Sequence, residues 1–178
     1  MIGYGDLRLD CINYIVGWTL HEKRNDPSIR DWCRQTGLID EMQQEKWIKW
    51  QSKDPNTKMY LIKHECRDNW DSVGVCGLTS IDWVHRRAEF SCYIFPEHHR
   101  QGFAKEALIL LFDHGFDDLN LNLIWGETFE GNHAYKLFVD KLGMTYDGRR
   151  RQFYYKNGKY IDALLISITK NEWKENRC

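Results

Sequence analysis

Residues 88–108, AEFSCYIFPEHHRQGFAKEAL, decide the fold. Residues 88–95 alternate between apolar and polar side chains, which is the pattern of a half-buried strand, and Pro96 ends it. A short polar loop follows, and Gly102 opens a helix. The first backbone N–H groups of a helix have no partner within the helix, and the helix dipole adds partial positive charge there. The sequence therefore predicts an anion cradle that suits a pyrophosphate.

The composition is that of a soluble globular chain. Of its 178 residues, 42% are hydrophobic and 29% are charged, which is typical of one domain with a packed core, so we expect a single domain over residues 1–178. The formal net charge of −1 gives no electrostatic case for a nucleic-acid partner. No apolar run approaches the ~20 residues needed to cross a bilayer, so we expect no membrane partner. The opening segment, MIGYGDLRLD, lacks a signal-peptide pattern, so we expect a cytoplasmic protein.

The cysteines do not form a metal-binding pattern. There are six of them, scattered through apolar surroundings and without a CxxC pair: Cys11, Cys33, Cys66, Cys76, Cys92 and Cys178. In a reducing compartment such residues behave as small hydrophobic side chains, and Cys178 as a thiol on a loose tail. Since zinc sites need closely spaced ligands, we expect no metal.

Strand and helix patterns along the chain predict an α+β fold. Alternation predicts strands at residues 7–9, 58–66, 73–83, 88–95, 121–129, 146–155 and 160–169. Helical spacing predicts helices at residues 13–24, 43–51, 105–117 and 133–141, with a short segment at 29–34 capped by Ser28. Short connections predict an antiparallel meander over residues 58–95, and Asn157-Gly158 predicts the final hairpin. The strands on either side of the cradle helix are candidates for a parallel pair. The expected architecture is a mixed, mostly antiparallel central sheet flanked by helices.

Several segments resemble the GNAT superfamily of acyl-CoA-dependent N-acyltransferases. Residues 96–108, PEHHRQGFAKEAL, are similar to the segment that holds the CoA pyrophosphate on backbone amides in that family. Residues 132–144, NHAYKLFVDKLGM, resemble its element beside the pantetheine arm. Residues 24–30, RNDPSIR, together with 88–90 and 157–162, resemble the branch of ribosomal-protein N-terminal, spermidine and nucleotide-aminosugar acetyltransferases. The resemblance covers nearly the whole chain and implies a GNAT-like fold with acetyl-CoA as cosubstrate.

The resemblance also implies which residues hold the coenzyme. They are Ile94, Phe95, Arg100, Gln101, Gly102, Phe103, Ala104, Asn132 and Phe138. A backbone N–H near Ile94 or Phe95 would polarise the thioester carbonyl, and the Asn132 amide would pair with pantetheine or cap a helix. The chain departs from the family at His99, where Arg or Gln is usual. It also departs at Phe138, where many members carry a Tyr that protonates the leaving thiolate, because a phenyl ring has no proton to donate.

Acetyl transfer needs a neutral amine, and Glu89 is the first candidate for the base that takes its proton. Strand alternation puts Glu89, Ser91 and Tyr93 on one face. Glu127, on the strand after the cradle helix, is a second candidate. Either carboxylate has the alternative role of a solvated surface group or a partner for a substrate ammonium. Tyr135, one helical turn before Phe138, is the candidate proton donor to the thiolate.

The expected function is acetyl transfer from acetyl-CoA to a primary amine by direct attack in a ternary complex. Three acceptors suit the resemblance: a protein N-terminus, a polyamine, or an amino sugar on a nucleotide. A polyamine would use acidic side chains such as those of Asp40, Glu41 and Glu45. A nucleotide sugar would use basic or aromatic side chains such as those of Arg30, Trp32 and Arg149.

Two other readings of the sequence stay open. Because Phe138 replaces the usual tyrosine, the chain can be a catalytically weak or inactive acyl-CoA-binding or regulatory module on the same fold. The glycine turn can also serve a nucleotide-binding protein, although neither of the usual phosphate-binding glycine motifs is present. A homodimer is a possible further partner, formed through the strand edge of the C-terminal hairpin.

Overall fold

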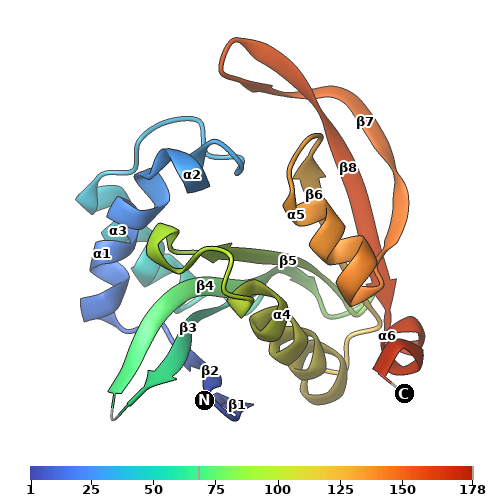
Figure 1. The fold of residues 1–178 in the computed structure, drawn as a ribbon, viewed down its shortest axis with the longest axis horizontal. Coiled ribbons are helices and arrows are strands. Elements are labelled where there is room, and N and C mark those ends of the chain that lie inside the picture. The colour runs from blue at the N-terminus through green and yellow to red at the C-terminus, as the bar shows by residue number, and fades with distance from the viewer. Residues whose placement is uncertain (68, 178) are drawn as a thin grey trace.

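The computed structural model describes residues 1–67 and 69–177, in which one sheet carries helices on both faces (Figure 1). Its eight strands lie in the order β1-β2-β3-β4-β5-β6-β8-β7. Every neighbouring pair is antiparallel except β5 and β6, which are parallel. The α+β class, the meander and the parallel pair expected from the sequence are therefore confirmed. The thiol expected at Cys178 lies outside the described residues.

The strands are β1 (Ile2–Tyr4), β2 (Leu7–Cys11), β3 (Lys58–Cys66), β4 (Asn69–Asp82), β5 (Arg87–Ile94), β6 (Leu123–Phe129), β7 (Thr145–Lys156) and β8 (Lys159–Thr169). The helices are α1 (Tyr14–Asn25), α2 (Pro27–Arg30), α3 (Glu41–Gln51), α4 (Phe103–Asp113), α5 (Ala134–Lys136) and α6 (Lys170–Arg177). A 3-10 turn (η1, Pro96–His98) precedes the glycine turn, and π-helical turns extend α4 (η2, His114–Asp118) and α5 (η3, Leu137–Lys141). No helix of the described residues is long and apolar enough to cross a membrane.

Two elements were not expected from the sequence, and one was misplaced. β1 has three residues, and α6 has eight with Trp173 as its only apolar side chain, so neither gives a repeating apolar pattern. The expected segment at 29–34 is instead α2, which ends at Arg30. Asp26, and not Ser28, caps it: the Asp26 side chain accepts the Ser28 N–H at 2.8 Å, and Pro27 takes the first helical position. Residues 31–40 are therefore an irregular segment that connects α2 to α3.

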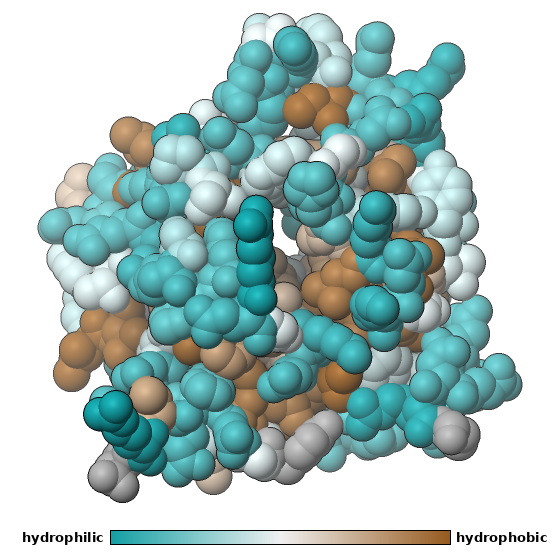
Figure 2. Space-filling model, in the orientation of Figure 1, coloured by the Kyte–Doolittle hydropathy of each residue, from teal (hydrophilic) through white to brown (hydrophobic). Residues whose placement is uncertain are grey.

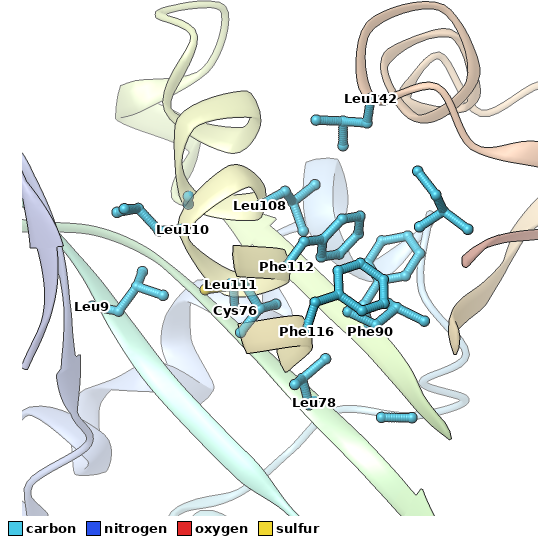
Figure 3. Close-up of a cluster of buried hydrophobic side chains, with 14 of the residues drawn as sticks. Leu9, Cys76, Leu78, Phe90, Leu108, Leu110, Leu111, Phe112, Phe116 and Leu142 are labelled. Carbon is cyan, nitrogen blue, oxygen red and sulfur yellow. The ribbon is translucent and has the colours of Figure 1, made fainter. Parts of the chain in front are cut away.

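The sheet buries a different cluster of side chains on each face. On one face, α4 packs its apolar side against Leu9, Cys76, Leu78 and Phe90, and Phe112 is fully buried there (Figure 3). On the other face, α1 and α3 cover a smaller cluster: Ile12, Leu20, Leu61, Val75 and Phe95. Neighbouring strand residues such as Val75 and Cys76 enter opposite clusters because strand side chains alternate between faces.

β5 and β6 pair only over a short stretch and then separate. Arg87–Glu89 lie opposite Leu123–Trp125, and beyond that point β5 continues along β4 while β6 continues along β8. Phe90 occupies the place where they part. A Cβ on Gly126 would lie 2.4 Å from the Phe90 ring, so only glycine allows this contact. The separation opens the sheet in front of the N-terminus of α4 (Figure 1).

Candidate active site

A cleft of about 750 Å³ lies where β5 and β6 separate. Its wall runs from the glycine turn at 98–105, along residues 91–94 of β5, to residues 132–134, 137 and 138 and to the segment from α2 to α3. Figure 2 shows the molecule hollowed at the centre of this face, with hydrophobic surface inside and polar surface around the rim. The two segments expected from the sequence to hold a coenzyme therefore face one cavity.

The glycine turn presents a run of unpaired backbone donors to the cleft. Gly102 has φ +91°, and Arg100 has φ +62°. Among the described residues, the N–H groups of residues 100–104 donate to no protein oxygen, and all five residues line the cleft. The next two N–H groups, those of Lys105 and Glu106, donate to the Gly102 carbonyl. Five consecutive free donors at the start of α4 form an anion-binding geometry.

The edge of β5 provides one of the two backbone donors expected for a thioester carbonyl. Phe95 N–H donates to the Val73 carbonyl at 2.9 Å, and its side chain is buried in the smaller cluster. Bonded and unbonded pairs alternate in an antiparallel ladder, so the Ile94 N–H points away from β4. The Ile94 carbonyl points the same way and contacts His99 Nε2 at 2.9 Å. The expectation for Phe95 is thus corrected, and Ile94 alone is left as a donor at the separated edge.

The second segment places Asn132 and Phe138 on the cleft and Tyr135 away from it. Asn132 Oδ1 accepts the Ala134 N–H at 3.0 Å, so its carbonyl caps the turn, while its NH₂ group donates no hydrogen bond to the described residues. Phe138 lines the cleft and packs edge-on against Phe90, with ring centroids 5.1 Å apart. Tyr135 packs against the main core and is not among the described residues that line the cleft. The expected reach of Tyr135 into the space around Phe138 is therefore not found.

Glu89 and Glu127 come together across the separating strands, and Arg34 joins them. Arg34 Nη2 lies 2.7 Å from Glu89 Oε1, and Arg34 Nη1 lies 3.4 Å from Glu127 Oε1. The Glu89 side chain is 8% exposed and that of Glu127 is 5% exposed, whereas that of Arg34 is 51% exposed. Arg34 lines the cleft and neither carboxylate does. The guanidinium therefore stands between the two acids and the cleft.

Two side chains of β7 complete this charged cluster. Arg150 Nη1 lies 3.0 Å from Glu127 Oε2, and the Tyr154 hydroxyl donates to Glu127 Oε1. Burial and the hydrogen bond to Glu127 raise the pKa of Tyr154 to about 12, so it stays protonated. Burial raises the pKa of Glu89 above its ordinary value, although the positive charge of Arg34 opposes the shift. Burial by itself would lower the pKa of Arg34, but the neighbouring acids, Glu89 first, raise it.

The part of the cleft away from the glycine turn is aromatic and contains no acid. Trp32, Trp47 and Trp50 line it, and Ser91 and Tyr93 extend it along the face of β5 that also carries Glu89. Within residues 1–67 and 69–177, no Asp or Glu lines the cleft. The acidic residues considered for a polyamine have other positions. Asp40 caps α3, Glu41 lies in its first turn, and Glu45 pairs with Lys49 at 2.7 Å.

Of the basic and aromatic residues expected to bind a nucleotide sugar, only one lines the cleft among the described residues. Trp32 lines the cleft, but Arg30 pairs with Asp31 at 3.4 Å, and Arg149 pairs with Asp162 at 3.1 Å.

Arg34 and Tyr154 are the site residues that the sequence did not reveal. Arg34 lies in the irregular segment after α2, where no period indicates a direction, and its partners are 55 and 93 positions away. Tyr154 comes after two register shifts within β7, and such shifts change the face of the sheet on which a side chain lies. Contacts of this kind depend on tertiary structure.

Comparisons with known proteins agree with this geometry. The family model described as the acetyltransferase (GNAT) domain matches residues 18–145. The uncharacterized N-acetyltransferase YoaA of Bacillus subtilis is 37% identical over 106 residues, 60% of each chain. The spermidine N(1)-acetyltransferase of Escherichia coli K12 is 33% identical over 124 residues, 67% of this chain and 62% of that protein. The matched segments thus span about three-fifths of the length of these curated relatives.

A solved structure extends the likeness of the fold to almost the whole chain. The spermidine N-acetyltransferase of Vibrio cholerae, in complex with CoA and spermine, superposes with a TM-score of 0.87 at 22% identity. The match covers 95% of this chain and 98% of that one. Since the family model spans more than half of the sequence, the protein belongs to the GNAT acetyltransferase family, whose cosubstrate is acetyl-CoA.

Proposed function

We propose that this protein transfers an acetyl group from acetyl-CoA to a primary amine, by direct attack in a ternary complex. The observation that carries the proposal is the continuity of the cleft. One cavity joins the free backbone donors of residues 100–104, the exposed edge of β5 at Ile94, and the aromatic end formed from α2 to α3. A coenzyme and an acceptor can therefore meet without moving any element of the sheet.

The coenzyme would lie along the separated edge of β5. Its pyrophosphate would accept hydrogen bonds from the N–H groups of residues 100–104. The Asn132 NH₂ group and Phe138 would face its pantetheine arm. Phosphate oxygens bound by backbone N–H groups at a helix start gain both hydrogen bonds and the dipole field. A thioester carbonyl opposite Ile94 would receive its N–H, which is the kind of donor that stabilises a tetrahedral oxyanion.

The acceptor amine must lose a proton before or during attack, and we propose that a chain of water molecules carries this proton to Glu89, because Arg34 stands between that carboxylate and the cleft. Glu89 lies two residues before Ser91 on the same face of β5, and Ser91 lines the cleft. Burial raises its pKa toward the range in which a carboxylate is an effective base. The amine nitrogen forms a bond to the carbonyl carbon, the carbon–sulfur bond breaks, and the proton taken by Glu89 ultimately protonates the thiolate. With a thiol pKa of about 8.5, the thiolate can leave without a tyrosine at Phe138.

The aromatic end of the cleft is the proposed acceptor site. Three indole rings, those of Trp32, Trp47 and Trp50, offer wide apolar contact with few polar groups. Relatives that acetylate spermidine make polyamines one candidate class, beside protein N-termini and amino sugars. All three classes supply the primary amine that the chemistry needs.

The test is release of the CoA thiol from acetyl-CoA, measured over a panel of amines representing these three classes. We expect turnover with at least one class, and loss of about 100-fold or more in kcat for Glu89→Gln without a matching change in the affinity for CoA. Tight binding of CoA with no thiol release over the whole panel would instead favour the alternative of a regulatory acyl-CoA-binding module. Failure to bind CoA at all would refute both.

A further inference from the structure

Arg34 occupies the position from which a positively charged acceptor would contact the acids of this site. Its guanidinium contacts both Glu89 and Glu127, and it lines the cleft that the two acids do not reach. Both carboxylates are almost completely buried, so a cation in the cleft could approach them only by displacing Arg34. The site therefore carries its own cation where a second ammonium of a substrate would bind.

The charges around this position give a polycation no substitute partner. Glu127 is already compensated by Arg150 and by the Tyr154 hydroxyl. No acid lines the cleft among the described residues, whereas Arg24, Arg100 and Lys105 add positive charge to its wall. An ammonium group leaves water only when a carboxylate or a comparable partner replaces its hydration. The indole faces offer a weaker alternative, since cation–π contacts at accessible sites are modest.

We propose that Arg34 is a specificity-determining residue that excludes polyamines and other polycations. The enzyme would thereby be restricted to acceptors with no second positive charge near the reacting amine. This inference rests on the proposed function, since it concerns the acceptor of that reaction. It separates the chain from relatives named for spermidine, although the fold is shared. Arg34 acts by occupying the position of a substrate cation and by holding both acids neutralised.

The experiment compares two amines of the same shape that differ in one charge. N-methyl-1,3-propanediamine carries a second ammonium where 3-methoxypropylamine carries an ether oxygen. We expect the wild type to prefer the ether amine by about tenfold or more in kcat/KM, the factor of one unfavourable charge contact. We expect Arg34→Gln to lose that preference. The ratio of the two kcat/KM values cancels any damage that the substitution does to the chemical step.

Arg150→Gln is the matched control, because Arg150 also pairs with Glu127 and is similarly exposed but does not line the cleft. Arg150→Gln removes one positive charge from Glu127, as Arg34→Gln does, but it leaves the cleft wall unchanged. We therefore expect it to leave the preference between the two amines unchanged. Arg34→Lys keeps a cation in place and is expected to retain the exclusion, which covers the case in which Arg34→Gln fails to fold. If neither probe is turned over, calorimetric binding of spermidine to the CoA complex gives the same comparison, with tighter binding expected only for Arg34→Gln.

The proposal is overturned if the wild type accepts the diamine as well as the ether amine. It is also overturned if wild type and Arg34→Gln bind spermidine equally, or if Arg150→Gln gives the same gain. These results differ from a failure of the proposed function, in which acetyl-CoA itself would not bind or no amine would release its thiol. Binding of CoA together with equal binding of polyamines would refute only the role of Arg34.

Discussion

Replacing Gly102 by alanine tests whether the backbone of the glycine turn holds the coenzyme. Gly102 has φ +91°, where an L-residue is strained by roughly 1–2 kcal/mol. A Cβ there would meet nothing closer than Glu106 Oε1 at 3.9 Å, so the substitution introduces strain without a steric clash. Alanine also recovers about 0.4–1 kcal/mol by restricting the unfolded chain. The net loss of stability should therefore stay near 1 kcal/mol, or about 2–4 °C in Tm for a chain of this size.

The effect on coenzyme affinity should be larger than the effect on stability. If the turn relaxes away from positive φ, the N–H groups of residues 102 and 103 no longer point at the pyrophosphate. A hydrogen bond to a charged group contributes about 1.5–3 kcal/mol, so losing one raises the Kd for CoA by about 10- to 100-fold. Isothermal titration of CoA into wild type and variant measures this directly, and thermal melting measures the strain.

Gly158→Ala supplies the control because it imposes the same strain elsewhere. Gly158 lies in the hairpin turn with φ +77° and open space around its Cα, and it is not one of the residues that line the cleft. It should lose a similar Tm and keep the wild-type affinity for CoA. A Gly102→Ala protein that binds CoA as tightly as wild type, with the expected fall in Tm, would show that the turn does not hold the diphosphate.

Three further predictions follow from other parts of the molecule. Phe138→Tyr places a phenol on the cleft wall and should raise kcat about tenfold or more in the thiol-release assay, and no rise would mean that protonation of the thiolate does not limit turnover. Phe112→Ala removes a fully buried ring and should lower the free energy of unfolding by about 3–5 kcal/mol in denaturant titrations, and a loss below about 1 kcal/mol would contradict the described core. Burial raises the pKa of Glu89, so its contribution to stability is full below the ordinary carboxyl pKa and is lost as pH rises through the raised pKa. Glu89→Gln should therefore gain stability relative to wild type as pH rises from below the ordinary carboxyl pKa through the raised one. The hydrogen bond from Lys23 lowers the pKa of Glu97, so Glu97→Gln should show the opposite trend, and equal trends for the two variants would refute the assignment.

The parts of the fold that were predictable depend on residues close together in the sequence. The alternation in residues 88–95 appears as β5, the Asn157-Gly158 pair closes the β7–β8 hairpin, and the helix after Gly102 begins one residue later at Phe103. Each of these features follows from local backbone preference and from the placing of apolar side chains on the buried face of their element. β1 and α6 were missed because a three-residue strand and an eight-residue helix with a single apolar side chain offer no repeating pattern to detect.

In the candidate site, too, the features set by neighbouring residues were predictable and those set by tertiary contacts were not. The donors at residues 100–104 were predictable because a glycine and a helix start specify where backbone N–H groups are free. Whether Phe95 or Ile94 supplies the donor was not predictable, because the answer depends on which residue faces Val73 in the ladder. Arg34 could not be placed either, since it bridges β5 and β6 from a segment without regular structure.

This division explains how a shared fold can carry different acceptors. The proposed coenzyme end is built from backbone groups, whose positions survive extensive change of side chains, and a TM-score of 0.87 at 22% identity shows that the fold survives such change. The acceptor end is built from side chains of α2, α3 and the irregular segment 31–40, and there a single residue can reverse the local charge. We expect that replacing the cation at position 34 would leave Glu89 without a charged partner and available to an ammonium group, while Glu127 keeps Arg150. Membership of the GNAT family therefore indicates acetyl-CoA as the cosubstrate, whereas the acceptor must be inferred from the charges that line this cleft.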